Sequence, residues 1–126
     1  TKEFSPKGIA FVAISPNDPG RVPEDSYENM IKRAKEKKFN FPYLYDSTSE
    51  IALAYGAKVT PHVFLLDGSF KLVYRGRIED ETEAKKSKSF DLKNGMNTLL
   101  AGKKIIVAET KAFGCSIKWR KQASAN

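Results

Sequence analysis

Sulfur and imidazole are scarce in this sequence, which has one cysteine and one histidine among its 126 residues. A single thiol cannot form an internal disulfide, which excludes the small domains that are held together by cystines. One cysteine and one histidine also fall short of a three- or four-ligand metal set, and no G-x-G-x-x-G or Walker loop occurs. We therefore expect no metal, no other cofactor and no nucleotide site.

Long hydrophobic runs and a continuous stretch of one charge sign are absent as well. No apolar run approaches the ~20 residues that cross a bilayer, so no membrane partner is expected. The net charge is +7, but the 22 lysines and arginines are interleaved with 15 acidic residues in Lys32–Lys38 and Glu79–Lys88. This mixing dilutes any positive stripe, so no nucleic-acid partner is expected.

The first half of the chain alternates strand-like and helix-like segments. Gly8–Ser15 is a nearly continuous apolar run, which predicts an interior strand covered on both faces. Asp25 or Ser26 can cap a helix that runs to about Lys38. The apolar residues of this helix, which follow the period of 3.6, are Tyr27, Met30, Ile31 and Ala34.

An aromatic segment, Phe39–Tyr45, is interrupted by Pro42 and precedes a second helix. Ser47–Glu50 matches a capping box, which predicts that the helix begins there and ends at Gly56. The residues expected on its buried side are Ile51, Ala52 and Tyr55.

The second half of the chain predicts a hairpin followed by a helix. Val63–Leu66 and Lys71–Arg75 flank a turn-type segment and are expected to form antiparallel strands. Phe90–Ala101 carries apolar residues on one face, with Gly102 just after its end, and predicts a helix that covers the sheet. Together these segments indicate a mixed α/β fold.

Thr60-Pro61-His62 lies between the second helix and the first hairpin strand. Proline fixes its own φ and has no amide hydrogen, so at the mouth of a strand it leaves the preceding backbone free to pair with another segment. This position predicts a cis-proline loop. The alternative, in which Pro61 only shapes a turn, stays open at this point.

Five stretches of the sequence, in the same order, resemble the redoxin family of thioredoxin-like proteins, grouped with alkyl hydroperoxide reductases and thiol-specific antioxidants. They extend over almost the whole chain. These stretches are Lys7–Asp18, Phe41–Asp46, Ala54–Asp67, Leu72–Asp80 and Gly114–Trp119.

The resemblance implies a thioredoxin-like α/β fold, a mixed sheet with flanking helices, of which this chain is the C-terminal portion. Family members carry a strand ending in a Cys-x-x-Cys type motif, and the helix that follows it, before the segment corresponding to Lys7–Ser15. No such motif occurs here. We expect residues 1–126 to form a single partial domain that lacks the central strand and the redox-motif helix. Strands without a neighbour invite pairing with a second copy, so a homo-oligomer through exposed strand edges is one outcome.

The resemblance also implies which residues act. Thr60, Pro61 and His62 would bind the substrate, with the Thr60 backbone pairing with an extended peptide. Independently of the resemblance, Cys115 is the only thiol in the sequence and thus the one candidate for a catalytic nucleophile or resolving thiol, with Lys118 or Arg120 expected to lower its pKa. The alternatives are that His62 points into solvent or satisfies a local hydrogen bond, and that Cys115 is a small buried hydrophobe.

The implied function is thiol–disulfide exchange or peroxide reduction, with a disulfide-containing or peroxide substrate and a thiol reductant as partners. Since the main attacking sulfur is expected outside residues 1–126, the isolated chain should be inactive. The alternative is a non-catalytic module that binds an extended polypeptide or a partner subunit. The N-terminus does not determine the compartment; we expect the cytoplasm, with the periplasm as the alternative.

Overall fold

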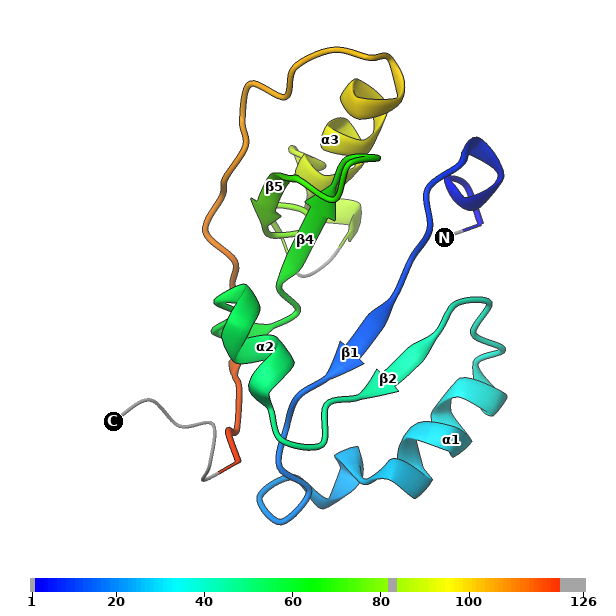
Figure 1. Cartoon of the computed structure of the whole chain (residues 1–126), viewed down its shortest axis with the longest axis vertical. Helices are drawn as coiled ribbons and strands as arrows, with labels where there is room; N and C mark the ends of the chain where they lie inside the picture. The colour runs from blue at the N-terminus through cyan, green and yellow to red at the C-terminus, as the bar shows by residue number, and fades with distance from the viewer. Residues whose placement is uncertain (1, 82–83, 121–126) are drawn as a thin grey trace. The chain divides into compact units, whose positions relative to one another are not determined.

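The computed structural model describes residues 2–81 and 84–120. The chain forms two compact units (Figure 1). The first unit consists of Thr1–Lys58 with Ser116–Asn126, and the second of Val59–Cys115. The single domain expected from the sequence stays a prediction. Among the helices of the described residues, none has the length and apolar character needed to cross a membrane.

A short parallel pair of strands organises the first unit. Strand β1 (Ala13–Ser15) pairs with β2 (Tyr43–Tyr45), so that Ala13 lies opposite Tyr43. Helix α1 (Tyr27–Glu36) packs against β2 (Figure 1). The remaining elements are helix α2 (Glu50–Tyr55) and the 3-10 turns η1 (Ser5–Lys7) and η2 (Pro23–Asp25).

The strand predicted at Gly8–Ser15 is shorter and more exposed than expected. The ladder starts where the Ala13 amide donates to the Pro42 carbonyl, at 2.9 Å. Because Pro42 has no amide hydrogen, it cannot extend the ladder toward the preceding residue. Val12 is 56% exposed, and Ser15 is the buried residue of β1. The expectation of an interior strand covered on both faces is therefore wrong.

Helix α1 begins where the sequence predicts and ends slightly earlier. The Ser26 hydroxyl accepts a hydrogen bond from the Asn29 amide at 3.2 Å, which is an N-cap contact. The helix ends at Glu36, because Lys38 has a positive φ of 52° and leaves the helical conformation. Met30 is only 2% exposed and anchors the helix in the core of the unit.

The capping box predicted for the second helix is wrong. Asp46, which directly follows β2 and is 2% exposed, supplies the cap instead of Ser47. Its Oδ1 accepts from the Ile51 amide at 3.3 Å, and its Oδ2 accepts from the Ala52 amide at 2.9 Å. The carboxylate satisfies two of the four amides that lack a partner within the helix and lies at the positive end of the helix dipole, so α2 starts at Glu50.

The apolar faces of the two helices are only partly buried. Ala52 is buried on α2, as Met30 is on α1. Side chains that were expected on the same faces but remain exposed are Tyr27, Ile31, Ile51 and Tyr55. These helices therefore cover less of the first unit than their sequence periodicity indicates.

The C-terminal segment after Cys115 completes the first unit. Ile117 is 4% exposed, and its amide donates to the Lys58 carbonyl at 3.1 Å. Lys118 pairs on both sides of its backbone, donating to Asn17 Oδ1 at 2.8 Å and accepting from the Asp18 amide at 2.7 Å. These bonds fix the segment against the loop that follows β1.

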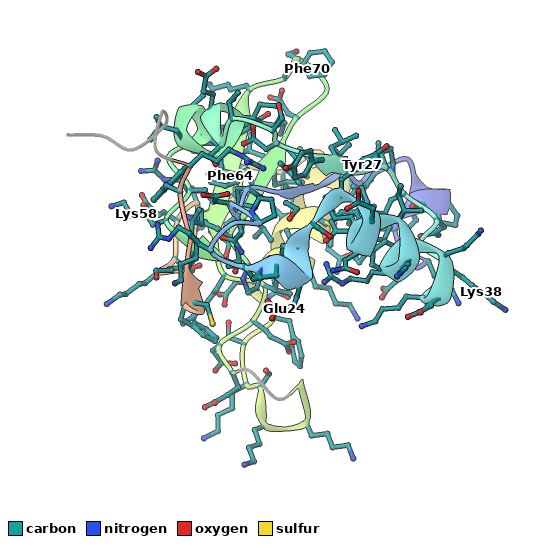
Figure 2. The ribbon with its side chains drawn as sticks, turned by 90° about the horizontal axis from the view of Figure 1, so that it is seen from below. Glu24, Tyr27, Lys38, Lys58, Phe64 and Phe70 are labelled. Atoms are coloured by element: carbon teal, nitrogen blue, oxygen red, sulfur yellow. The ribbon has the colours of Figure 1, made fainter. Side chains whose placement is uncertain are left out.

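An antiparallel hairpin forms the centre of the second unit, as the sequence predicts. Strand β4 (Val63–Leu66) pairs with β5 (Leu72–Gly76), with Leu65 opposite Tyr74. In the turn, Asp67 Oδ1 accepts from the backbone amides of residues 69 and 71. Phe70, at the tip, is 85% exposed and projects outward (Figure 2).

Helix α3 (Asp91–Leu100) packs against both hairpin strands, which confirms the helix predicted at Phe90–Ala101. It ends before Gly102, whose φ of +71° is the left-handed conformation expected of a C′ glycine. The buried apolar core between the helix and the hairpin consists of Leu65, Tyr74 and Met96.

Over the described residues the strands form three separate two-stranded sheets, and the expected lack of a central strand stays a prediction. Over residues 2–81 and 84–120, β1 is paired with β2 alone and β4 with β5 alone. Within that part of the chain, β1 and β4 thus each have one edge without a strand neighbour. An unpaired edge carries backbone donors and acceptors that another strand could use.

Candidate functional site

The peptide bond between Thr60 and Pro61 is cis. Strand β3 (Val59–Thr60) leads into it, and β4 follows two residues later. Thr60 is half-buried, whereas Pro61 is exposed. The loop therefore offers the proline ring to an approaching molecule at the entrance to the hairpin.

The chain's own C-terminal part lies beside this loop. Strand β3 pairs with β6 (Cys115–Ser116) in a two-stranded sheet. The residue just before β6 is Gly114, which has a φ of +149°. A Cβ atom at this position would lie 2.1 Å from the Thr60 carbonyl oxygen and 3.3 Å from Pro61 Cδ. Only glycine fits here, because it has no Cβ and tolerates this φ.

His62 is half-buried and lies against an aromatic neighbour. Its ring stacks on Phe64, with the ring centroids 4.6 Å apart and an angle of 29° between the planes. Phe64 belongs to β4. The stacking fixes the imidazole on the hairpin strand that follows the cis-proline loop.

Cys115 is not part of a disulfide, and its side chain is exposed. The alternative of a buried hydrophobic cysteine is therefore wrong, and Ile117 is the residue of this stretch that is buried. Cys115 and Ser116 are both exposed, and burial begins at Ile117, just beyond β6. The thiol is accessible to solvent and to other molecules.

The basic residues after Cys115 are engaged with other acceptors. Lys118 Nζ donates to the carbonyl oxygen of Ser116 at 2.9 Å and to its hydroxyl at 2.7 Å. The Arg120 guanidinium lies 3.6 Å from Asp18 Oδ1 and also hydrogen-bonds the hydroxyl of Tyr45. Arg120 therefore holds the C-terminal segment in place, whereas the Lys118 ammonium is engaged within that segment.

A polar network in the second unit supports the hairpin. Tyr74, which is 1% exposed, donates its hydroxyl to the Arg77 carbonyl at 2.6 Å and shares a 2.6 Å hydrogen bond with Thr110 Oγ1. Burial raises the pKa of Tyr74. Arg77 Nε donates to Asp91 Oδ2 at 2.6 Å, and this bond raises the pKa of Arg77. The network ties the end of β5 to the start of α3.

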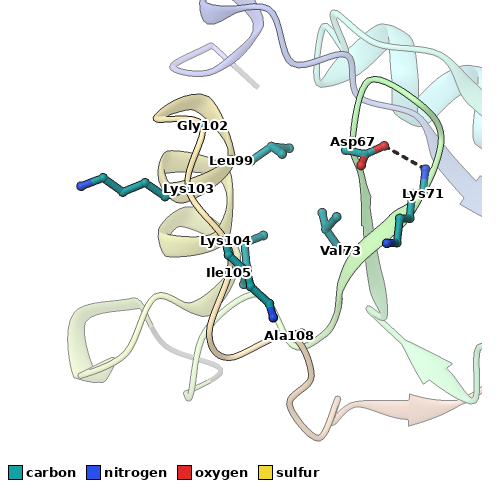
Figure 3. A pocket seen from close by; sticks show the side chains of 9 residues that line it. All are labelled: Asp67, Lys71, Val73, Leu99, Gly102, Lys103, Lys104, Ile105 and Ala108. Atoms are coloured by element: carbon teal, nitrogen blue, oxygen red, sulfur yellow. Dashed lines mark hydrogen bonds between the residues drawn. The ribbon is translucent and has the colours of Figure 1, made fainter.

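A hollow of about 410 Å³ lies elsewhere in the second unit, between the hairpin and the end of α3 (Figure 3). Val73, Leu99 and Ile105 line its apolar part, and lysines stand at its rim. The Lys103 side chain points away from the hollow (Figure 3). Lysines just beyond a helix C-terminus interact favourably with the negative end of the helix dipole, which is a sufficient reason for the presence of Lys103 and Lys104.

The described residues contain no group of three or more histidine, cysteine, aspartate or glutamate side chains that could hold a metal ion. The site described above offers a proline loop and one accessible thiol. Sequence reasoning missed the role of Gly114. A glycine directly before the lone cysteine was the signal that could have revealed the close backbone approach.

Comparison with known proteins shows one family match. The model of the AhpC/TSA family matches residues 1–78, a range that includes Thr60, Pro61 and His62 but not Cys115. No curated protein matches the chain.

Two solved structures are similar along nearly the whole chain. A hypothetical protein from Sinorhizobium meliloti 1021 is 34% identical with a TM-score of 0.86, covering 95% of this chain and 67% of that one. An uncharacterized conserved protein from Geobacillus kaustophilus is 40% identical with a TM-score of 0.88, covering 98% of this chain and 66% of that one. The chain thus spans about two thirds of the length of each.

These similarities confirm the mixed α/β, thioredoxin-like fold that the sequence predicts. The family match indicates a redox function with thiol or peroxide substrates in general. It covers more than half of the residues and includes the cis-proline loop. The chain therefore belongs to the AhpC/TSA family.

Proposed function

We propose that this chain serves thiol–disulfide exchange or peroxide reduction by aligning the oxidised substrate at the cis-proline loop and supplying a second thiol. Thr60, Pro61 and His62 form the aligning loop. Cys115 is the resolving thiol, and the thiolate that first attacks the substrate is supplied by a cysteine outside residues 1–126.

The observation that carries this proposal is the location of Cys115. Its exposed thiol belongs to the strand that pairs with β3, which leads directly into the cis-proline bond. A resolving thiol has to reach the sulfur that reacts beside the substrate, so it must be both accessible and close to the aligning loop. Cys115 meets both requirements within this chain.

The chemical step balances with two thiols and one oxidant. The first thiolate attacks a peroxide oxygen, which releases an alcohol or water and leaves a sulfenic acid. The Cys115 thiolate then attacks that sulfur, and water leaves as the disulfide forms. With a disulfide substrate, the first attack gives a mixed disulfide, and Cys115 displaces the remaining substrate thiolate. A thiol reductant returns both cysteines to the reduced state.

The test is thiol exchange with 5,5′-dithiobis(2-nitrobenzoate) on the folded chain. We expect one equivalent of the coloured thiolate to be released without denaturant, and none from Cys115→Ser. We also expect hydroperoxide consumption in the presence of dithiothreitol to be no faster than that of free cysteine. A thiol that reacts only after unfolding would contradict the resolving role, and rapid catalytic turnover by this chain would show that Cys115 itself is the attacking sulfur.

A further inference from the structure

The backbone edge of β3 that leads into the cis-proline bond is occupied by a segment of the same chain. In an extended strand, the N–H and C=O groups of alternate residues point to the same edge. The backbone groups of Lys58 and Thr60 therefore lie on the same edge. The Lys58 carbonyl accepts from the Ile117 amide at 3.1 Å, and the Thr60 carbonyl faces Gly114. Strand β6, which lies between these two contacts, pairs with β3.

Gly114 is the residue that makes the close approach to Thr60 possible. A Cβ at this position would lie 2.1 Å from the Thr60 carbonyl oxygen and 2.9 Å from its carbonyl carbon. Both atoms belong to the backbone, which cannot rotate away as the end of a flexible side chain can. Any other residue would therefore push the segment off the edge.

We propose that Gly114 and Cys115 close the Thr60 edge and that Gly114 thereby determines substrate specificity, an inference that rests on the proposed function. A strand edge offers one row of donors and acceptors, and a second extended chain cannot use a row that is already paired. Extended polypeptides are thus excluded from this edge. Oxidants small enough to reach the exposed ring of Pro61 without forming strand pairs are accepted.

The occupied edge changes the expectation drawn from the sequence, in which the Thr60 backbone pairs with an extended peptide. It also weakens the alternative in which the Thr60–Pro61 edge binds an extended polypeptide, because that edge is already paired. The ligands that fit are small hydroperoxides or small disulfides, because they can contact the cis-proline loop without pairing with its backbone as a strand.

The experiment uses a fluorescein-labelled peptide with the sequence of residues 111–119, in which serine replaces Cys115, and measures its anisotropy as protein is added. Wild type should not bind it. Gly114→Ala should bind at least about tenfold more tightly than wild type, because the displaced segment frees the edge. Ile117→Ala, which loosens the segment at its other anchor, should also bind. The matched control is Gly68→Ala, since a Cβ at Gly68 would meet nothing within 4 Å.

Two outcomes would overturn the inference. The first is a wild-type chain that binds the peptide as tightly as Gly114→Ala. The second is that neither Gly114→Ala nor Ile117→Ala binds the peptide although the circular dichroism spectra of both variants match that of wild type. Should neither variant fold, hydrogen exchange on wild type decides: the Ile117 amide should be protected, and exchange at the unfolded rate refutes the docked segment.

This result is independent of the thiol-exchange test, because peptide binding requires no turnover. Loss of thiol exchange at Cys115 would remove the resolving role and leave the edge occupied. Peptide binding by wild type would remove the specificity argument and leave the thiol chemistry intact. The two failures are therefore distinguishable.

Discussion

Removal of the Asp46 carboxylate should destabilise the first unit through the start of α2. Asp46 is 2% exposed and accepts from the amides of Ile51 and Ala52 at 3.3 and 2.9 Å. Loss of an N-cap side chain costs about 0.5–2 kcal/mol, and a buried carboxylate with two bonds belongs at or above the upper end of that range. We therefore expect Asp46→Ala to lower the free energy of unfolding by about 2–3 kcal/mol.

The matched control is Ser47→Ala, because the capping box in the sequence assigns the cap to Ser47 and the structure assigns it to Asp46. Ser47 is exposed, so its replacement should change the free energy of unfolding by less than about 0.5 kcal/mol. With a urea m-value of about 1.5 kcal/mol/M, Asp46→Ala should move the midpoint down by about 1.5 M. A near-neutral Asp46→Ala together with a loss of about 1 kcal/mol in Ser47→Ala would refute the reasoning.

Three further predictions concern the second unit. Gly76→Ala should lower the free energy of unfolding in urea by at least about 2 kcal/mol, because Gly76 has a φ of +142° and the new Cβ would lie 2.2 Å from Thr110 Oγ1. The control, Gly68→Ala, should leave that free energy nearly unchanged. Tyr74→Phe should cost about 1–2 kcal/mol by losing the hydroxyl's bonds to Arg77 and Thr110. Since burial raises the pKa of Tyr74, the unfolded chain ionises first, and wild-type stability should fall above about pH 10, more steeply than that of Tyr74→Phe. The backbone amides of Ser89 and Lys88 donate to Asp80 and lower its pKa. Wild type should therefore be more stable than Asp80→Asn above about pH 4, and this difference should disappear as the pH falls further. Acid unfolding followed by circular dichroism measures it.

Local signals in the sequence were sufficient for the elements that depend on neighbouring residues. The hairpin of β4 and β5 follows from two apolar runs around an Asp-Gly turn, and the structure has the same pairing. The end of α3 follows from Gly102, which adopts the left-handed conformation that glycine favours. In both cases a few adjacent residues determine the backbone.

Features that depend on how the fold orients a side chain, or on contacts between distant segments, could not be predicted. The cap of α2 comes from Asp46, because β2 ends just before it and directs its carboxylate at the next helix. The partner of Thr60 is Gly114, and only the folded chain brings the two together. Sequence analysis identified Thr60, Pro61, His62 and Cys115 as site residues, and their roles stay proposals. The accessible thiol of Cys115 required the structure, because a lone cysteine is more often buried.

The hydroxyl of Ser49 has a practical consequence for anyone who tags or trims this protein. It donates to the Pro16 carbonyl at 2.7 Å and accepts from the Arg120 amide at 3.2 Å, in a fully buried position. A cut or a fused label ahead of Arg120 would thus open the interior and strip a partner from a sequestered polar atom. Handles for purification or spectroscopy belong beyond that arginine.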